Sequence, residues 1–108
     1  MKRTIVRYTV KPGEAELNAD LVRAVYRELA ELNPRGFKYA TYRLDDGRTF
    51  IHIAEQQGEG DNPLPTLSAF QEFQAGARER CEWGPEVSSA AEEIGRYAES
   101  ERGGEGRM

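Results

Sequence analysis

Residues 37–56 read FKYATYRLDDGRTFIHIAEQ and contain two alternating segments, Phe37–Leu44 and Thr49–Gln56, joined by Asp45-Asp46-Gly47-Arg48. The first segment is rich in tyrosine and threonine, and both residue types favour strands. An Asp-Gly pair between two alternating segments is a strong signal for a tight hairpin. The middle of the chain is therefore predicted to form two antiparallel strands.

A strand and a long helix are predicted before this hairpin. Ile5–Val10 alternates, with Val6, Tyr8 and Val10 on one face, and runs into Lys11-Pro12-Gly13. Apolar residues then recur at helical spacing until Asn33-Pro34-Arg35-Gly36, where the proline disfavours further helix. The predicted helical stripe consists of Leu17, Leu21, Val25, Leu29 and Leu32, with Val22 on its flank.

A loop, a second helix and a last strand are predicted after the hairpin. Gln57–Pro65 is polar and contains glycine and proline, which is typical of a loop and would suit a lid. Thr66 is a suitable N-cap for a helix that Trp83-Gly84-Pro85 would end. A weak alternation over Glu92–Tyr97 predicts an edge strand. The stripe of the second helix is Leu67, Phe70, Phe73, Ala77 and Cys81.

Together these elements predict a ferredoxin-like α+β fold in the order β-α-β-β-α-β. Such a unit forms a four-stranded antiparallel sheet with both helices on one face. The length of 108 residues fits one domain, predicted over 1–98, followed by a disordered polar tail over 99–108. The strands carry apolar residues on both faces, so the face without helices needs a cover. We therefore expect two copies to pair through their sheets as a homodimer.

Composition and charge argue against several classes of partner. The net charge is −4, and 15 basic residues are interspersed with 19 acidic ones, so no basic surface for nucleic acid is expected. No apolar run approaches the roughly 20 residues that span a bilayer, and the chain begins in a strand. With Cys81 as the single cysteine, a cytoplasmic location is expected. One histidine cannot supply a convincing metal site, so no metal is expected.

The chain resembles the antibiotic-biosynthesis-monooxygenase-like family of dimeric α+β barrels over roughly residues 4–98. The resemblance rests on the order of the elements and on four features: Ile5–Gly13 with its Val10-Lys11-Pro12-Gly13 ending, the long helix, the strand that follows Gly36, and Phe50–Glu55 before the second helix. It implies a barrel formed by two sheets and a pocket between the helices and the sheet of each subunit.

For chemistry, the resemblance implies cofactor-free oxygenation of an electron-rich aromatic or a quinol. Family members often carry a tryptophan just after the third strand, whereas here Glu55 is followed by Gln56 and Gln57. Haem-degrading members use a histidine on the second helix, and Leu67–Cys81 contains none, so haem is not expected.

His52 is the candidate catalytic residue, because a histidine near its ordinary pKa of about 6.5 can take a proton from a phenol at neutral pH. Its strand places His52 with Phe50 and Ala54, on the face opposite Ile51 and Ile53. If the isoleucines face the helices, His52 faces the dimer interface. A residue of that interface without a catalytic role is the alternative interpretation.

A ligand pocket is predicted beside the second helix. Tyr8 and Tyr39 could donate hydrogen bonds to a substrate, although both are also ordinary strand residues. Gly76 interrupts the apolar stripe and implies a close approach or free space beside Phe70 and Phe73. Gln74 and Glu28 lie at stripe margins and are expected to reach solvent. The predicted ligand-binding residues are Tyr8, Tyr39, Phe70, Phe73, Gln74 and Gly76.

The leading functional hypothesis is a cofactor-independent monooxygenase acting on a small aromatic, with His52 or a water molecule as the base. The alternative is a homodimer of the same fold that binds a small molecule or serves a structural role without catalysis, because a fold does not fix a function. The absence of the tryptophan favours this alternative. An isomerase or decarboxylase on the same barrel is a third hypothesis.

Overall fold

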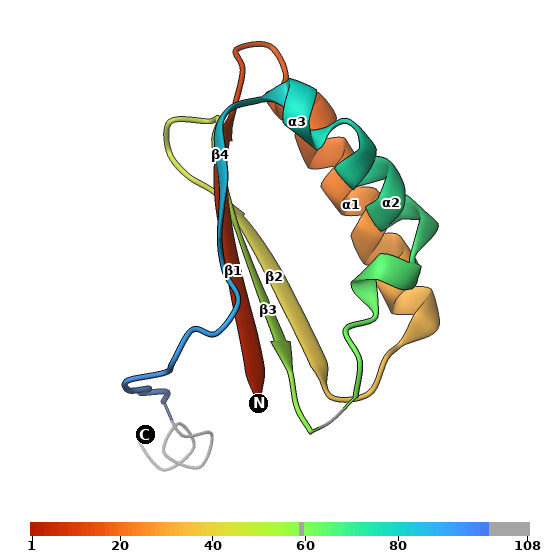
Figure 1. The fold of residues 1–108 in the computed structure, drawn as a ribbon, viewed down its shortest axis with the longest axis vertical. Coiled ribbons are helices and arrows are strands. Elements are labelled where there is room, and N and C mark those ends of the chain that lie inside the picture. Colours follow the sequence, from red (N-terminus) through yellow and green to blue (C-terminus); the bar gives the residue numbers. More distant parts are fainter. Residues whose placement is uncertain (59, 100–108) are drawn as a thin grey trace, which may run out of the picture.

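A computed structural model of the chain describes residues 1–58 and 60–99. Four strands form one antiparallel sheet in the order β2-β3-β1-β4, and the helices cover one of its faces (Figure 1). This is the predicted ferredoxin-like α+β arrangement. The predicted tail over 99–108 lies outside the described residues from position 100 onward. In chain order the elements are β1 (Lys2–Val10), α1 (Ala15–Leu32), β2 (Phe37–Arg43), β3 (Thr49–Gln56), the 3-10 turn η1 (Leu64–Thr66), α2 (Ser68–Ala75), α3 (Ala77–Arg80) and β4 (Cys81–Ser88).

The β2–β3 hairpin forms where the Asp-Gly sequence predicts it. The Asp46 carboxylate accepts hydrogen bonds from the backbone N–H groups of Arg48 and Thr49 and from the Thr49 hydroxyl. These bonds lower the pKa of Asp46 to about 2 and close the turn. The register pairs Arg43 with Phe50, and so aligns β2 with the central strand β3.

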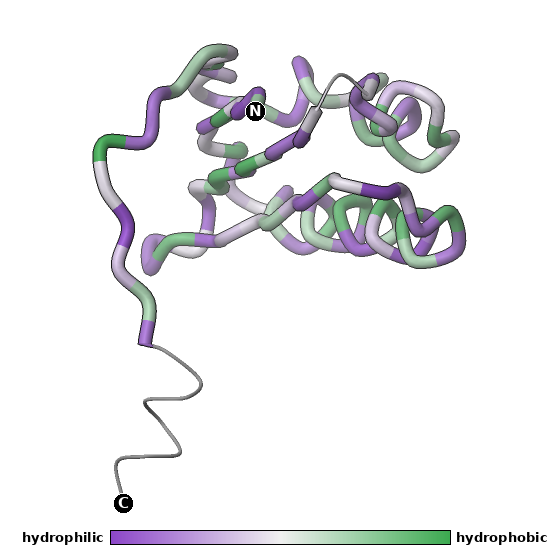
Figure 2. The backbone as a smooth tube through the Cα atoms, turned by 90° about the horizontal axis from the view of Figure 1, so that it is seen from below, coloured by the Kyte–Doolittle hydropathy of each residue, from purple (hydrophilic) through white to green (hydrophobic). Residues whose placement is uncertain are grey.

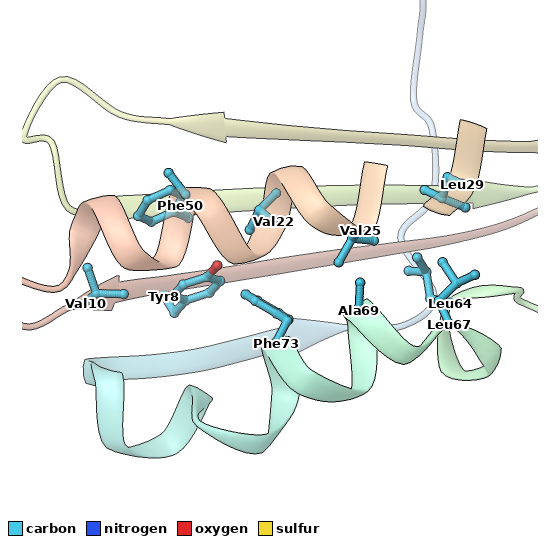
Figure 3. Close-up of a cluster of buried hydrophobic side chains, with 11 residues drawn as sticks. Tyr8, Val10, Val22, Val25, Leu29, Phe50, Leu64, Leu67, Ala69 and Phe73 are labelled. Carbon is cyan, nitrogen blue, oxygen red and sulfur yellow. The ribbon is translucent and has the colours of Figure 1, made fainter. Parts of the chain in front are cut away.

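The core lies between the sheet and the two longer helices (Figure 3). The predicted helix is present as α1, and its Val25 and Leu29 are buried as expected. Leu17 and Leu32 were predicted to lie in the same stripe, but each is 51% exposed. The buried face runs instead through Asn18, Val22, Val25 and Leu29, at helical spacing. Because the first residue of this face, Asn18, is polar, a pattern based only on apolar residues did not identify it.

The last strand begins earlier in the sequence than predicted, directly after α3. β4 covers Cys81–Ser88 and pairs with β1, whereas residues 92–97 form no strand. Trp83-Gly84-Pro85 therefore lies within a strand and does not end a helix as predicted, because α3 already ends at Arg80. An edge strand can include Pro85 because the missing N–H costs no bond to a neighbour. Gly84 has φ +89° where β1 approaches closely, since an added Cβ would lie 2.9 Å from the Arg7 carbonyl oxygen.

The second helical region is shorter and more divided than the stripe predicts. Thr66 ends the turn η1, and Leu67 occupies the N-cap position of α2. Cys81 was predicted to be a helical residue but begins β4 and pairs with Val10. The Lys11 backbone N–H donates to the Arg80 carbonyl, so pairing with the end of β1 overrides the helical spacing at this point.

The two faces of β3 are the reverse of the prediction. Phe50 and His52 are buried beneath the helices, whereas Ile51 and Ile53 are only partly covered on the opposite face. Both sets contain large apolar side chains, so alternation separates the faces without showing which one meets the helices. The register settles this, because His52 lies opposite Val6 and Phe50 opposite Tyr8, on the face of β1 whose Tyr8 and Val10 are buried in the core.

The sheet face opposite the helices, here called the open face, has no covering helix. Its apolar residues include Ile5, Ile51 and Ile53, and Tyr42 and Trp83 are 56% and 47% exposed. The segment 89–99 leaves β4 on this side, as Figures 1 and 2 show. It is attached by the Ala91 N–H, which donates to the Arg3 carbonyl. Among the described residues, no helix is both long enough and apolar enough to cross a membrane.

Replacing Gly84 with alanine is expected to destabilise the fold by roughly 2 kcal/mol, because the new Cβ would meet β1 and the positive φ disfavours it. Urea unfolding monitored by circular dichroism measures this loss. Gly95→Ala is the matched control, since nothing lies within 4 Å of its Cβ position. Equal midpoints for the two variants would contradict the close approach of β4 to β1.

Candidate functional site

A cavity of about 330 Å³ lies between α2 and the sheet. Figure 3 shows Phe73 of α2 pointing toward Tyr8 of β1 at this level. The volume is at the lower end of the range for small-molecule sites and suits a ligand of one to three fused rings. The lining residues are Thr4, Val6, Tyr8, Tyr39, His52, Ala54, Asn62, Leu64, Pro65, Phe70, Phe73, Gln74, Ala77, Cys81, Pro85 and Val87.

The structure brings most of the predicted site residues to this one cavity. Tyr8, Tyr39, Phe70, Phe73 and Gln74 all line it. The rings of Phe70 and Phe73 lie 6.0 Å apart, and Phe73 is tilted against Tyr8 at 6.3 Å. Flat apolar walls with a few polar groups are typical of sites for aromatic ligands. Binding of a ligand by these residues remains a prediction.

His52 also lines the cavity, because its face of β3 is opposite to the one predicted. Its side chain therefore lies on the helix side of the sheet, and not on the face through which the dimer was expected to form. The imidazole lies between two phenols: its Nε2 is 2.7 Å from the Tyr8 hydroxyl, and its Nδ1 is 2.8 Å from the Tyr39 hydroxyl. Thr41 adds a third hydroxyl, 3.0 Å from Nδ1. Strands β1, β3 and β2 each contribute to this hydrogen-bonded group.

Burial sets the protonation states of these groups. It lowers the pKa of His52 to about 4, so the imidazole is neutral at pH 7. Burial also raises the pKa values of Tyr8 and Tyr39 well above their ordinary range, so both phenols stay protonated. A neutral imidazole between two hydroxyls can accept a proton at one nitrogen while giving one up at the other. The group can therefore move a proton without acquiring a net charge.

Two polar residues of the site escaped the sequence analysis. Asn18 is 1% exposed, and its side-chain N–H donates to the Tyr8 hydroxyl over 2.9 Å. Arg80 is 6% exposed and donates from Nε to the Asn18 side-chain oxygen over 3.1 Å. A polar residue inside an apolar helical face was the available signal for Asn18. The sequence offers no comparable signal for Arg80, because its burial depends on the end of α3.

The other residues singled out in the sequence have simpler positions. Gly76 separates α2 from α3 and does not line the cavity; an added Cβ would lie 2.8 Å from Nη1 of Arg80. Its small size makes room for the guanidinium and not for a ligand. Gln74 is exposed at the cavity rim. Glu28 accepts hydrogen bonds from the Ser68 hydroxyl and the Ala69 N–H, which lower its pKa and join α1 to the start of α2.

The chemistry open to this cavity is proton movement and hydrogen bonding beside an apolar wall. Three residues of the predicted lid, Asn62, Leu64 and Pro65, contribute to the lining. Burial raises the pKa of the Cys81 thiol, which disfavours the nucleophilic thiolate. Over residues 1–58 and 60–99, no group of three or more histidine, cysteine or acidic side chains is arranged to hold a metal ion.

Comparisons with known proteins identify the same fold. No protein-family model and no curated protein matches the chain. Among solved structures, an antibiotic biosynthesis monooxygenase is 14% identical, with a TM-score of 0.67, over 85% of this chain and 98% of its own. A conserved protein from Methanosarcina mazei Go1 is 20% identical, with a TM-score of 0.63, over 81% and 87%.

A third similar structure is a mutant of SnoaB, a cofactor-independent oxygenase from Streptomyces nogalater. It is 15% identical to the chain, with a TM-score of 0.58, and the match covers 88% of this chain and 97% of that one. Identities this low establish a shared fold and leave the activity open. The predicted resemblance to antibiotic-biosynthesis-monooxygenase-like structures is thus confirmed at the level of the fold.

The depressed pKa of His52 predicts a specific loss of stability in mild acid. Between the unfolded pKa of about 6.5 and the folded pKa of about 4, only the unfolded chain binds the proton. Stability is therefore complete above the unfolded value and declines as the pH falls, by up to roughly 3 kcal/mol for this group. Urea unfolding at pH 7, 6 and 5 measures the decline. The variant His52→Gln should lack this component, and identical pH slopes for the two proteins would contradict it.

Proposed function

We propose that this chain is a cofactor-independent monooxygenase acting on a small aromatic or a quinol. The observation that carries the proposal is the neutral imidazole of His52, held between two phenols at the wall of an apolar cavity. The fold shared with a structure described as a cofactor-independent oxygenase supports it. His52 is the proposed catalytic residue, and no bound cofactor is part of the mechanism.

The substrate itself would supply the electrons. Loss of a proton from an electron-rich ring gives a carbanion or enolate, which passes an electron to O2, and the two radicals combine. For a substrate with a ring CH2 group, the balanced change is CH2 + O2 → C=O + H2O. All four electrons that reduce O2 come from the ring carbon, so no external reductant is needed. The apolar cavity would keep bulk water away from the intermediate.

In this proposal the chain contributes positioning and proton control. Phe70 and Phe73 would hold the ring against the sheet, and the Tyr39 hydroxyl would contact a ring oxygen. His52 would pass protons within the group formed with Tyr8 and Tyr39. Because its pKa is about 4, His52 is uncharged at pH 7 and can take part in both directions of proton movement.

The alternative function is a homodimer that binds a small molecule without catalysis. It rests on Gln56 and Gln57, which follow Glu55 where the family often has a tryptophan. Gln56 is buried, and its side-chain amide donates to the Gln57 carbonyl at the start of the loop. This position therefore adds no aromatic side chain to the cavity wall. Ligand binding without oxygen consumption would favour this alternative.

We also propose that the protein is a homodimer formed through the open face. Ile5, Ile51 and Ile53 lie there only partly covered. Further large apolar residues are exposed on this side, in part on the segment 89–99: Tyr42, Trp83, Ile94 and Tyr97. A second copy would bury this surface as a core between two sheets, which is a common way to complete a small domain. Beyond itself, the proposed partner is a small aromatic ligand.

Oxygen uptake by the purified, metal-free protein, measured against a panel of dihydroxynaphthalenes and anthrones, tests the enzymatic proposal. His52→Gln is expected to lower the rate at least roughly 100-fold, because it removes the group that exchanges protons. Tyr26→Phe is the matched control: its hydroxyl bonds Thr41, but Tyr26 does not line the cavity, so its rate should stay within about twofold. No uptake by the wild type would favour the binding alternative, and full uptake by His52→Gln would remove His52 from catalysis.

Light scattering at micromolar concentration tests the dimer. The wild type is expected at twice the chain mass of 12.2 kDa. Ile53→Glu, which places a charge on the open face, should shift the mass to that of one chain. Leu32→Glu is the control, because Leu32 is 51% exposed and lies at the end of α1, not on the open face. A wild type of single-chain mass would contradict the dimer.

A further inference from the structure

Arg80 is a buried cation without an acidic partner in the described part of the chain. Only 6% of it is exposed, and none of the ion pairs includes it. Its guanidinium donates to the Phe73 carbonyl over 2.8 Å and lies 5.3 Å from the centre of the Phe73 ring. A buried charge is costly unless it is well hydrogen-bonded. The third contact of this cation, with Asn18, leads toward the cavity.

The guanidinium fixes the orientation of the Asn18 amide. Arginine carries only hydrogen-bond donors, so the atom of Asn18 that meets Nε of Arg80 must be the oxygen. The amide NH2 group then faces the Tyr8 hydroxyl, whose oxygen must accept a hydrogen bond from it over 2.9 Å. The reverse orientation would bring two donors together at Arg80. Arg80 therefore determines that Tyr8 is an acceptor toward Asn18.

The Tyr8 hydroxyl then directs its own proton to His52. In the described residues, its hydrogen-bond partners are Asn18 and Nε2 of His52. If both donated to Tyr8, the phenolic proton would be left without an acceptor at a residue that is 4% exposed. Tyr8 therefore donates to Nε2 over 2.7 Å, and His52, being neutral, carries its proton on Nδ1.

Tyr39 connects His52 to the cavity. The Nδ1–H group of His52 faces the Tyr39 and Thr41 hydroxyls at 2.8 and 3.0 Å. Tyr39 then accepts from His52, and no other hydrogen bond of its hydroxyl is present in the described residues. Since Tyr39 lines the cavity, its phenolic proton is available to a molecule bound there.

We propose that Arg80 and Asn18 are positioning residues that hold His52 in the Nδ1–H tautomer, so that Tyr39 offers the cavity a hydrogen-bond donor. The cavity would then select an aromatic ligand with an acceptor oxygen, such as a carbonyl or an ionised phenol. The part concerning the ligand rests on the proposed function, whereas the tautomer does not. The site would stabilise a ring oxygen as negative charge develops on it.

The tautomer can be measured directly, because His52 is the only histidine among the 108 residues. Long-range proton–nitrogen correlation spectra at pH 7 report the protonation of each ring nitrogen. The wild type is expected to show a protonated Nδ1 and an unprotonated Nε2. A protonated Nε2, or a charged ring at this pH, would overturn the proposal. This measurement needs neither a ligand nor activity.

The variant Asn18→Asp provides the decisive comparison. A carboxylate has only acceptors, so it would pair with Arg80 and would also accept a hydrogen bond from the Tyr8 hydroxyl. The oxygen of Tyr8 would then have to accept a hydrogen bond from His52. The proton of His52 should therefore move to Nε2. Arg80→Lys keeps a donor at position 80 and should preserve Nδ1–H. An unchanged tautomer in folded Asn18→Asp would overturn the role of Asn18, and a misfolded variant leaves the wild-type spectrum as the test.

Binding of 1,4-naphthoquinone, which has only acceptor oxygens, tests the ligand part. Followed by fluorescence or calorimetry, Tyr39→Phe should weaken binding about tenfold through the loss of one donor, and Tyr26→Phe should not. Naphthalene should bind both variants equally. Unchanged quinone binding in Tyr39→Phe, or no quinone binding by the wild type, would overturn the proposed ligand class. A failure of oxygen uptake alone would affect only the proposed enzymatic function.

Discussion

The burial of one imidazole constrains the interior of this protein more than any other single contact. His52 is 4% exposed beneath the helices, where an unsatisfied ring nitrogen would cost about 1–3 kcal/mol. Both nitrogens find hydroxyls, one on β1 and one on β2, and these two strands flank β3. The hydrogen bonds of this group therefore join the three strands that also form the wall of the cavity. Stability and the candidate site depend on the same bonds.

The polar chain continues beyond the sheet and connects the two layers. Asn18 of α1 reaches Tyr8, and Arg80 at the end of α3 reaches Asn18. Gly76 has no side chain at the point where the guanidinium passes, which explains a glycine between two helices. A core made only of apolar residues would pack the layers together without fixing the direction of any hydrogen bond. Here the same contacts that join the layers also determine which groups can donate to the cavity.

The open face differs from the helix face in its mixture of apolar and charged residues. Its apolar residues are spread over all four strands and are interrupted by charges, including the pair formed by Arg3 and Glu55. Arg3 and Arg96 also bind Glu93, which lies in the segment that follows β4. Such a mixture is compatible with the proposed pairing of two copies through this face. The cavity, in contrast, lies wholly on the side of the helices.

The sequence by itself determined the order of the elements and those helices and strands that local sequence features define. The Asp45-Asp46-Gly47 turn, the proline after Asn33 and the helical spacing of Val25 and Leu29 are local features, and each element they predict is present. It also indicated the aromatic residues of the cavity, since Tyr8, Tyr39, Phe70 and Phe73 line it together. The order of these elements was sufficient to predict the ferredoxin-like arrangement that the solved structures share.

Only the tertiary structure decided which face of β3 meets the helices, where β4 begins and which buried polar residues are hydrogen-bonded to Tyr8 at the cavity wall. Alternation separates the two sides of a strand but is symmetric between them, so the position of His52 depended on its pairing with β1. Helical spacing through Cys81 was overridden by hydrogen bonds to the end of β1. Asn18 and Arg80 lie 62 positions apart, and their contact exists only because the chain brings α1 and α3 together.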